Sequence, residues 1–270
     1  MTTAIHEYAS AARVFDRLAA EYDSVFTFSS IGKAQREVVW QKALAAFSPG
    51  SHILELNCGT GEDALFLAKS GMRVTACDAS FGMIKQARSR MAAETPDAGI
   101  EFLALATENI GALPDNLRFD GIFSNFSGLN CVRDIRRVAQ QLALRLGAGA
   151  PVLICLSTRY CFWEIVYYLL RGNRRKAFRR CNGLTQAHIG DLELTVYYPT
   201  LAELNTAFAP NFRLRSVTGI GIAVPPSYLG PWIDAHPRLL MLMKRIDAVV
   251  CKWPGVRIVG DHILLHLERT

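Results

Sequence analysis

The sequence lacks the features of a disulfide-bonded, secreted or membrane-spanning protein. Its seven cysteines form no C-x-x-C pair and their number is odd, so neither a disulfide framework nor a cysteine-based metal site is indicated. No run of about 18 residues is both apolar and uncharged, which argues against a spanning helix. The start of the chain has neither the basic nor the apolar region of a signal peptide. We therefore expect a cytoplasmic protein.

The sequence also lacks a histidine pattern that binds metal. Its six histidines include no i,i+4 pair and no H-E-x-x-H, so we expect no metal. A lone histidine is usually structural. His188 is the exception we retain as a candidate, because it lies in a segment expected beside a substrate.

Positive charge is concentrated in one place. The net charge is +6, from 30 basic and 24 acidic residues, and the stretch 171–180 alone contains six basic residues and no acid. Without them, 24 basic residues face 24 acidic ones, so no extended nucleic-acid-binding surface is indicated. The cluster is either a solvated helix face, or a patch for an anionic acceptor or a membrane surface. The apolar stretch before it makes peripheral membrane contact through 160–180 conceivable.

The middle of the chain alternates strand-like and helix-like segments. This pattern predicts parallel strands joined by helical crossovers, with helices on both faces of the sheet. The later part predicts a long helix at 159–180, a strand at 192–199, a sixth main strand within 212–224, a helix at 238–253 and a final strand at 261–269. The first strands are expected at 52–56, 73–78, 100–106, 119–126 and 151–156.

The stretch "ELNCGTGEDA" matches a dinucleotide-binding turn in form. Gly59-Thr60-Gly61-Glu62-Asp63-Ala64 fits G-x-G-x-x-G/A between a strand and a helix, and Asp78 ends the next strand. Acids at Glu55, Glu62 and Asp63 would repel a pyrophosphate at the helix N-terminus. S-adenosylmethionine (SAM) carries a sulfonium and no phosphate, and the carboxylate of Asp78 can accept hydrogen bonds from its ribose hydroxyls.

Four ordered segments resemble class I SAM-dependent methyltransferases. They are "VFDRLAAEYDSVF", "ILELNCGTGEDA", "VTACDAS" and "FDGIFSNFSGLNCV", and the resemblance covers about residues 10–160. It implies a Rossmann-like, doubly wound seven-stranded sheet, mostly parallel with an antiparallel last strand, plus helical cover insertions. We expect one domain over 1–270: an N-terminal helical cover (1–50), a SAM-binding core (51–157), and the rest of the sheet (158–270) with acceptor-side insertions at 158–200 and 222–256.

The resemblance also assigns residues to the cofactor. The usual first glycine of the turn is Asn57 here, a residue that tolerates left-handed backbone. The acid often found before the adenine-contacting pair is Ala106. Tyr22 matches a tyrosine at the boundary between cofactor and acceptor, and Tyr22 and His188 are the candidate catalytic groups. The predicted cofactor-binding residues are Tyr22, Glu55, Asn57, Cys58, Gly59, Thr60, Gly61, Asp78, Ala79, Ser80, Met83, Thr107, Glu108, Asn125 and Phe126.

We therefore expect methyl transfer from SAM to an O, N or C atom of a small aromatic or lipid-like acceptor. The alternatives are a non-catalytic SAM-binding sensor or partner subunit, and an RNA methyltransferase. The latter is disfavoured because the fourth strand ends in "SNFSG" and lacks the N/D-P-P-Y/F motif for a flipped base. The acceptor, the methylated atom, the need for a general base and the oligomeric state remain open at this stage.

Overall fold

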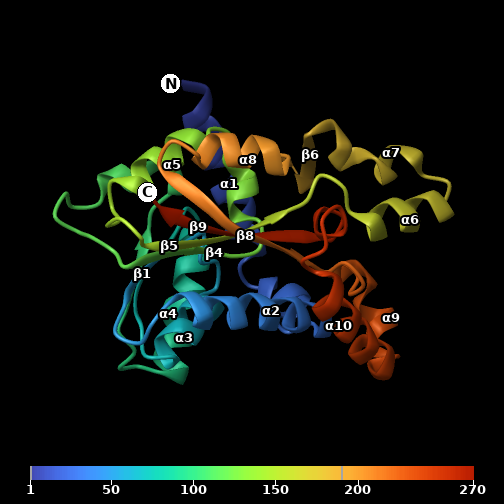
Figure 1. Ribbon diagram of the computed structural model, residues 1–270, viewed down its shortest axis with the longest axis horizontal. Coiled ribbons are helices and arrows are strands. Elements are labelled where there is room, and N and C mark those ends of the chain that lie inside the picture. Colours follow the sequence, from blue (N-terminus) through green and yellow to red (C-terminus); the bar gives the residue numbers. More distant parts are fainter. Residues whose placement is uncertain (1, 190) are drawn as a thin grey trace.

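A single sheet of seven strands organises the protein, as described by a computed structural model over residues 2–189 and 191–270 (Figure 1). The strand order is β3-β2-β1-β4-β5-β9-β8. β9 is antiparallel to both of its neighbours, and the remaining pairs are parallel. The strands are β1 (His52–Leu56), β2 (Arg73–Asp78), β3 (Ile100–Ala104), β4 (Gly121–Ser124), β5 (Pro151–Ser157), β8 (Phe212–Ile220) and β9 (His262–Arg269). The expected doubly wound sheet with an antiparallel last strand is confirmed.

Helices cover both faces of this sheet, which explains why its central strands are apolar throughout. Figure 1 shows α2, α3 and α4 on one face and α1, α5 and α8 on the other. Leu54 and Ile122 belong to the core beneath α5 and α8, whereas Ile53 and Phe123 belong to the core beneath α2–α4. These helices are α1 (Thr2–Leu18), α2 (Ser30–Ala46), α3 (Glu62–Lys69), α4 (Phe81–Glu94), α5 (Ile135–Ala143) and α8 (Leu201–Phe208).

The segment after β5 differs from the single helix expected over 159–180. It breaks into α6 (Phe162–Leu170), α7 (Arg174–Ala177) and a 3-10 turn at Arg179–Asn182. Gly172 adopts a φ of 70° and the Asn173 side chain caps α7, which together end the first helix. The predicted strand at 192–199 is β7 (Leu192–Tyr197), but it pairs with β6 (Leu184–Ile189) in a separate two-stranded sheet.

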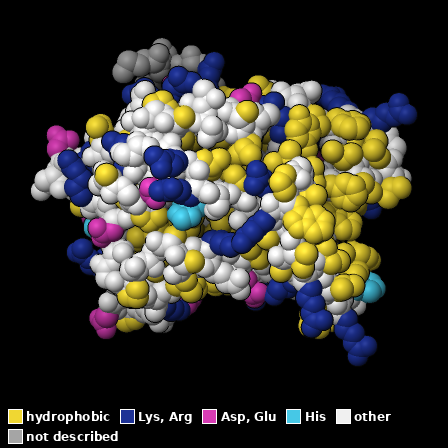
Figure 2. Space-filling view, in the orientation of Figure 1, with side chains coloured by type: hydrophobic (Ala, Val, Ile, Leu, Met, Phe, Trp, Pro, Cys, Tyr) yellow, Lys and Arg dark blue, Asp and Glu magenta, His cyan; other side chains and the backbone are white. Residues whose placement is uncertain are grey.

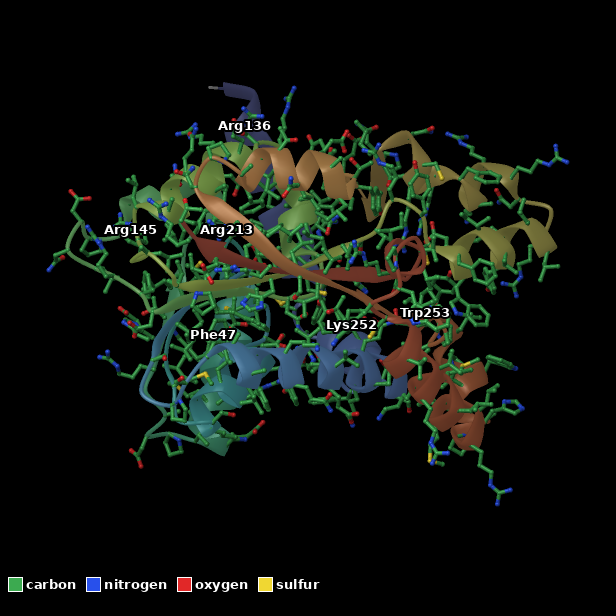
Figure 3. All side chains as sticks on the ribbon, in the orientation of Figure 1. Phe47, Arg136, Arg145, Arg213, Lys252 and Trp253 are labelled. Atoms are coloured by element: carbon green, nitrogen blue, oxygen red, sulfur yellow. The ribbon has the colours of Figure 1, made fainter. Side chains whose placement is uncertain are left out.

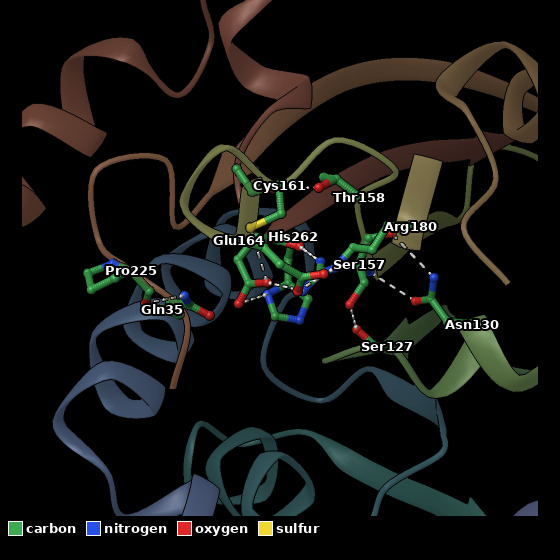
Figure 4. Close-up of polar contacts among 12 residues, drawn as sticks. Gln35, Ser127, Asn130, Ser157, Thr158, Cys161, Glu164, Arg180, Pro225 and His262 are labelled. Carbon is green, nitrogen blue, oxygen red and sulfur yellow. Dashed lines mark hydrogen bonds and ion pairs between the residues drawn. The ribbon is translucent and has the colours of Figure 1, made fainter. Parts of the chain in front are cut away.

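A buried ionic network fixes this insertion to the sheet (Figure 4). The Glu164 carboxylate accepts hydrogen bonds from Arg179 at 2.7 and 2.9 Å and from Arg180 at 3.0 Å. Arg180 also donates to the Asp261 carboxylate, just before β9, at 3.0 Å. Two of the six basic residues of 171–180 therefore stabilise the fold. The other four, Arg171, Arg174, Arg175 and Lys176, are exposed.

Four further helical segments belong to the cover and to the second insertion. A π-helical segment, η1 (Asp23–Thr27), joins α1 to α2. Between β8 and β9, where a helix over 238–253 was expected, the chain forms η5 (Ser227–Leu229), α9 (Gly230–Asp234) and α10 (Pro237–Val250). Both the segment after β5 and the segment after β8 leave the sheet at the carboxyl ends of these strands, the edge at which α/β sheets bind ligands.

Candidate functional site

The turn after β1 has the left-handed backbone that its glycines allow. Gly59 and Gly61 have φ values of 54° and 79°, and Asn57 also has a φ of 54°. A Cβ added to Gly59 would meet no atom within 4 Å, whereas one added to Gly61 would lie 2.8 Å from the Ala87 side chain. Gly59 therefore opens onto the pocket, and Gly61 instead permits close packing of α3 against α4.

Asn57 is accommodated by a second glycine. A Cβ at Gly128 would lie 2.1 Å from the Asn57 Cβ, so the two backbones approach closely only because Gly128 has no side chain. The Thr107 hydroxyl donates to the Asn57 carboxamide oxygen at 3.1 Å. The departure from the usual glycine at position 57 is thus matched by a glycine in the loop after β4.

Asp78 ends β2 beside this turn. Its carboxylate accepts hydrogen bonds from the Gly59 N–H at 3.0 Å and from the Ser80 N–H at 2.8 Å. Burial raises the pKa of Asp78 to about 6, although these two backbone donors oppose the shift. Ser80 has a structural role: its hydroxyl caps α4 and donates to Asp16 of α1 at 2.6 Å.

The two acids that open α3 are both paired, contrary to the repulsion expected from the sequence. Glu62 forms an ion pair with Arg90 of α4. Asp63 forms a buried ion pair with Arg36 of α2 and accepts hydrogen bonds from Trp40 at 2.5 Å and Asn125 at 3.2 Å. Their charges are largely compensated, so these acids repel a diphosphate less than the sequence alone implied.

Glu55 is close to Asp63 and Asp78 but does not line the pocket. Its side chain is buried, and its Oε2 has no hydrogen-bond partner among the described residues. Burial, with the nearby charge of Asp63, raises the pKa of Glu55 well above its ordinary value. Glu55 therefore keeps one carboxyl oxygen available to a donor.

Two regions far apart in sequence close the pocket: α1 with the adjoining η1, and the β6–β7 hairpin. The Thr60 hydroxyl donates to Asp23 of η1 at 2.6 Å, and Arg90 pairs with the same carboxylate. The Asn130 side chain donates to the Tyr197 carbonyl of β7 at 2.6 Å. The empty space, including the open mouth, is about 1080 Å³, which accommodates a nucleoside-sized ligand.

Most of the predicted cofactor residues line this pocket. Three do not: Glu55 is buried outside the lining, and Gly61 and Ser80 serve helix packing and capping. The predicted residues in the lining are Tyr22, Asn57, Cys58, Gly59, Thr60, Asp78, Ala79, Met83, Thr107, Glu108, Asn125 and Phe126.

Of the two candidate catalytic residues, only Tyr22 lies in the pocket. Tyr22 lines the pocket, and burial raises its pKa to about 12, so its hydroxyl remains a hydrogen-bond donor at neutral pH. His188 lies outside the pocket on β6, where its exposed ring is 3.5 Å from Glu193 of β7. The structure therefore gives no geometric support to His188 as a base.

Several pocket residues were not foreseen. Arg36, from α2, reaches the pocket with its guanidinium 4.8 Å from the centre of the Phe126 ring. Phe126 and Ser127 have φ values of 44° and 69°, a strained conformation of the kind that clusters at functional sites. The cover adds an apolar wall, formed by Ala11, Ala12, Phe15, Leu194 and Val196. Only the approximate position of the cover helix was readable from the sequence.

Thiol and metal chemistry receive no support from the described residues. Burial raises the pKa of Cys131, which lines the pocket, to about 12, so this thiol is a neutral part of the wall. Within residues 2–189 and 191–270, no three His, Cys, Asp or Glu side chains gather as a metal site would require. The expectation that no metal is used stays a prediction.

Comparison with known proteins agrees with the geometry. Residues 53–149 match the family described as "Methyltransferase domain". A demethylmenaquinone methyltransferase from Clavibacter sepedonicus is 36% identical over 147 residues, which is 53% of this chain and 56% of that protein. The chain thus matches just over half the length of this relative.

Solved structures share the whole fold at low sequence identity. A SAM-dependent methyltransferase from Listeria monocytogenes is similar over 88% of this chain and 98% of its own, with a TM-score of 0.61 and 16% identity. The magnesium protoporphyrin IX methyltransferase from Synechocystis, solved with bound S-adenosylhomocysteine, covers 98% and 100% of the two chains, with a TM-score of 0.61 and 11% identity.

Proposed function

Because this chain contains a class I SAM-dependent methyltransferase domain, we propose that it transfers the methyl group of SAM to a small, apolar, ring-containing acceptor. One observation carries the proposal: the Asp78 carboxylate and the left-handed turn at Gly59 meet at one side of a pocket at the carboxyl edge of the sheet. A carboxylate in this position suits a ribose diol.

The polar groups of the pocket fit the parts of SAM. Asp78 would accept hydrogen bonds from the ribose hydroxyls, and the turn from Asn57 to Thr60 would lie along the methionine part. Ala79, Met83, Thr107 and Glu108 would surround the adenine. Glu55, with its free oxygen, would accept a hydrogen bond from the ammonium group. Asn125 and Phe126 would lie near the sulfonium.

SAM, when bound, supplies an electrophilic methyl group, so the protein mainly has to align an acceptor and exclude water. Alignment of this kind can lower a reaction barrier by about 7–11 kcal/mol. Tyr22 is a donor that orients the acceptor rather than a base, because its pKa is raised to about 12. Arg36, held by Asp63 and lying over the Phe126 ring, presents guanidinium N–H donors that can bind an acceptor oxygen.

We propose a lipid-like acceptor with a phenol or quinol ring. The relative from Clavibacter is named for a quinone substrate. In this chain, Phe15, Phe126, Leu194 and Val196 give the pocket an apolar wall, and Arg36 supplies the single guanidinium among its lining residues. A ring hydroxyl that ionises beside Arg36 would activate the ring for attack from oxygen or from an adjacent carbon.

Incubation of the purified chain with methyl-labelled SAM and four acceptor classes tests this function. The classes are a naphthoquinol with an isoprenoid tail, a simple catechol, a phospholipid and RNA. We expect label in the tailed quinol first. Label in RNA alone would contradict the proposal. Tight SAM binding without transfer to any acceptor would favour the non-catalytic, SAM-binding alternative.

The division into a cover at 1–50, a core at 51–157 and acceptor-side insertions at 158–200 and 222–256 is part of the same proposal. In its support, α1 and the hairpin of the first insertion line the pocket. The cytoplasmic location also stays a prediction, supported by the seven free cysteines.

A further inference from the structure

A large apolar surface lies at the end of the molecule formed by α6, α9 and α10. Figure 2 shows hydrophobic side chains gathered over these helices on the right of the view. Leu170 is 83% exposed, Val249 64% and Trp253 53%. Contacts of Tyr228 with Tyr167 and Tyr168 join α6 to the segment before α9, so the surface is continuous. We call it the insertion face; its exposed apolar members are Phe162, Leu169, Leu170, Tyr228, Trp232, Met241, Leu242, Ile246, Val249 and Trp253.

The outer side of α10 mixes apolar and cationic residues without an acid. Arg238, Leu242, Arg245 and Val249 follow one another at spacings of four, three and four, so they share one face of the helix. The acid of α10, Asp247, is on the inner side, where its carboxylate accepts hydrogen bonds from the Ala223 and Val224 N–H groups. An ordinary solvent-facing helix side would carry acids and few large apolar residues.

More cations surround this face. Figure 3 labels Lys252 and Trp253, which follow α10, to the right of Arg136, Arg145 and Arg213, with Lys252 near the middle of the view. On α6 and α7, Arg171 lies 3.9 Å from the centre of the Tyr167 ring and Lys176 lies 5.6 Å from that of Tyr168. The exposed acid of the adjoining α9 is Asp234, so cations outnumber acids on the insertion face.

We propose that the insertion face is a docking surface for an anionic lipid bilayer, on which α10 and α6 lie in the interfacial plane. Apolar side chains flanked by Lys and Arg are the pattern of interfacial helices, and tryptophan favours the headgroup level. No helix among the described residues is long and apolar enough to cross a bilayer, so the contact is peripheral. The charge of the face is complementary to anionic headgroups and selects them over a second copy of the same cationic surface.

This docking deepens the proposed function, on which it rests for the identity of the membrane-borne acceptor. Both insertions of the face leave the sheet at its carboxyl edge, where the pocket also lies. A chain seated in this way would hold its pocket near the headgroups, where a quinol with an apolar tail can reach it without entering water.

Co-sedimentation with vesicles tests the docking. We expect the full chain to bind vesicles of phosphatidylcholine with 30% phosphatidylglycerol in low salt, and pure phosphatidylcholine at least about 10-fold more weakly. Tryptophan fluorescence should shift to shorter wavelength on binding, and the Trp253→Phe variant should lose much of the shift. Each neutralised cation should weaken partition about five-fold, equivalent to about 1 kcal/mol.

Matched variants make the test specific to this face. The Arg245→Gln, Lys252→Gln double variant should bind about 25-fold more weakly. Arg136→Gln, Arg213→Gln, with the same charge change on exposed residues outside the insertion face, should bind like the parent. Val249→Asp should also lose binding, and Leu144→Asp, an exposed change at the end of α5, should not.

Two outcomes would overturn the docking. One is equal binding by both double variants; the other is a stable dimer that the Val249→Asp change dissociates while vesicle binding is absent. SAM binding measured without lipid separates the two proposals. A parent chain that binds SAM but no vesicles rejects the docking alone, and a parent chain that does not bind SAM rejects the proposed function.

Discussion

Asp78 is the carboxylate that we expect to bind the ribose of SAM, and burial raises its pKa to about 6. Ionised Asp78 accepts hydrogen bonds from a ribose diol, and protonated Asp78 accepts them poorly. Because the group is protonated below about pH 6, the affinity for SAM should fall about 10-fold between pH 7 and pH 5. Titration calorimetry over this range checks the slope. In the Asp78→Asn variant the affinity should be at least about 10-fold lower at pH 7 and nearly independent of pH.

The close approach of Asn57 and Gly128 predicts a coupled pair. Gly128→Ala would place a methyl group against the Asn57 side chain and should lower the free energy of unfolding by about 2 kcal/mol. In an Asn57→Gly background the same change should cost at least about 1 kcal/mol less. Urea denaturation of the four proteins measures this coupling, and strictly additive effects would show that the contact is absent.

At the residue level, the sequence predicted the parts of the site that follow directly from a strand end. Asn57, Gly59 and Asp78 come immediately after β1 or at the end of β2, so a local pattern locates them. Arg36 and Leu194 reach the pocket through the packing of α2 and β7, which no local pattern specifies. His188 was misplaced for the same reason: the hairpin register pairs it with Glu193 at an exposed position.

At the scale of elements, η1 depends on a small ionic cluster above the turn. Asp23 accepts a hydrogen bond from Thr60 and pairs with Arg90, which also pairs with Glu62. Asp23→Asn should therefore loosen the cover over the pocket. We expect faster amide exchange over residues 10–30 and about 10-fold faster dissociation of SAM.

The matched control is Asp191→Asn. Asp191 pairs with Arg17 of the same cover helix, but both side chains are exposed, and such pairs contribute little. Exchange in 10–30 and SAM dissociation should be unchanged in this variant. Equal effects of the two substitutions would mean that the cluster at Asp23 does not secure the cover.

The helices and strands were predicted correctly where one hydrophobic pattern continued through a segment, and wrongly at the insertions. β1 and β2 match the expected ranges at both ends because a buried run is bounded by turn residues on each side. The predicted helix at 159–180 continued through Gly172 and Asn173, whose left-handed backbone and capping side chain end α6. β6 has as many polar as apolar residues, so its pairing with β7 becomes visible only in three dimensions.

At the scale of the whole molecule, the Glu164 network attaches the first insertion to the sheet. The Glu164 carboxylate is nearly fully buried and pairs with Arg179 and Arg180. Glu164→Gln would remove the negative charge that both arginines share. We expect a loss of about 3 kcal/mol in the free energy of unfolding and a clear drop in Tm, measured by thermal denaturation. Glu94→Gln, which breaks the exposed pair with Lys69, is the control and should change stability by less than about 1 kcal/mol.

The central claim is that the pocket at the carboxyl edge binds SAM. Calorimetric titration of the purified chain with SAM, and separately with NAD, tests it most directly. We predict one SAM site per chain, competition by S-adenosylhomocysteine, marked weakening by Asp78→Asn, and no measurable heat with NAD. Binding of NAD in preference to SAM, or SAM binding that Asp78→Asn leaves unchanged, would contradict the account.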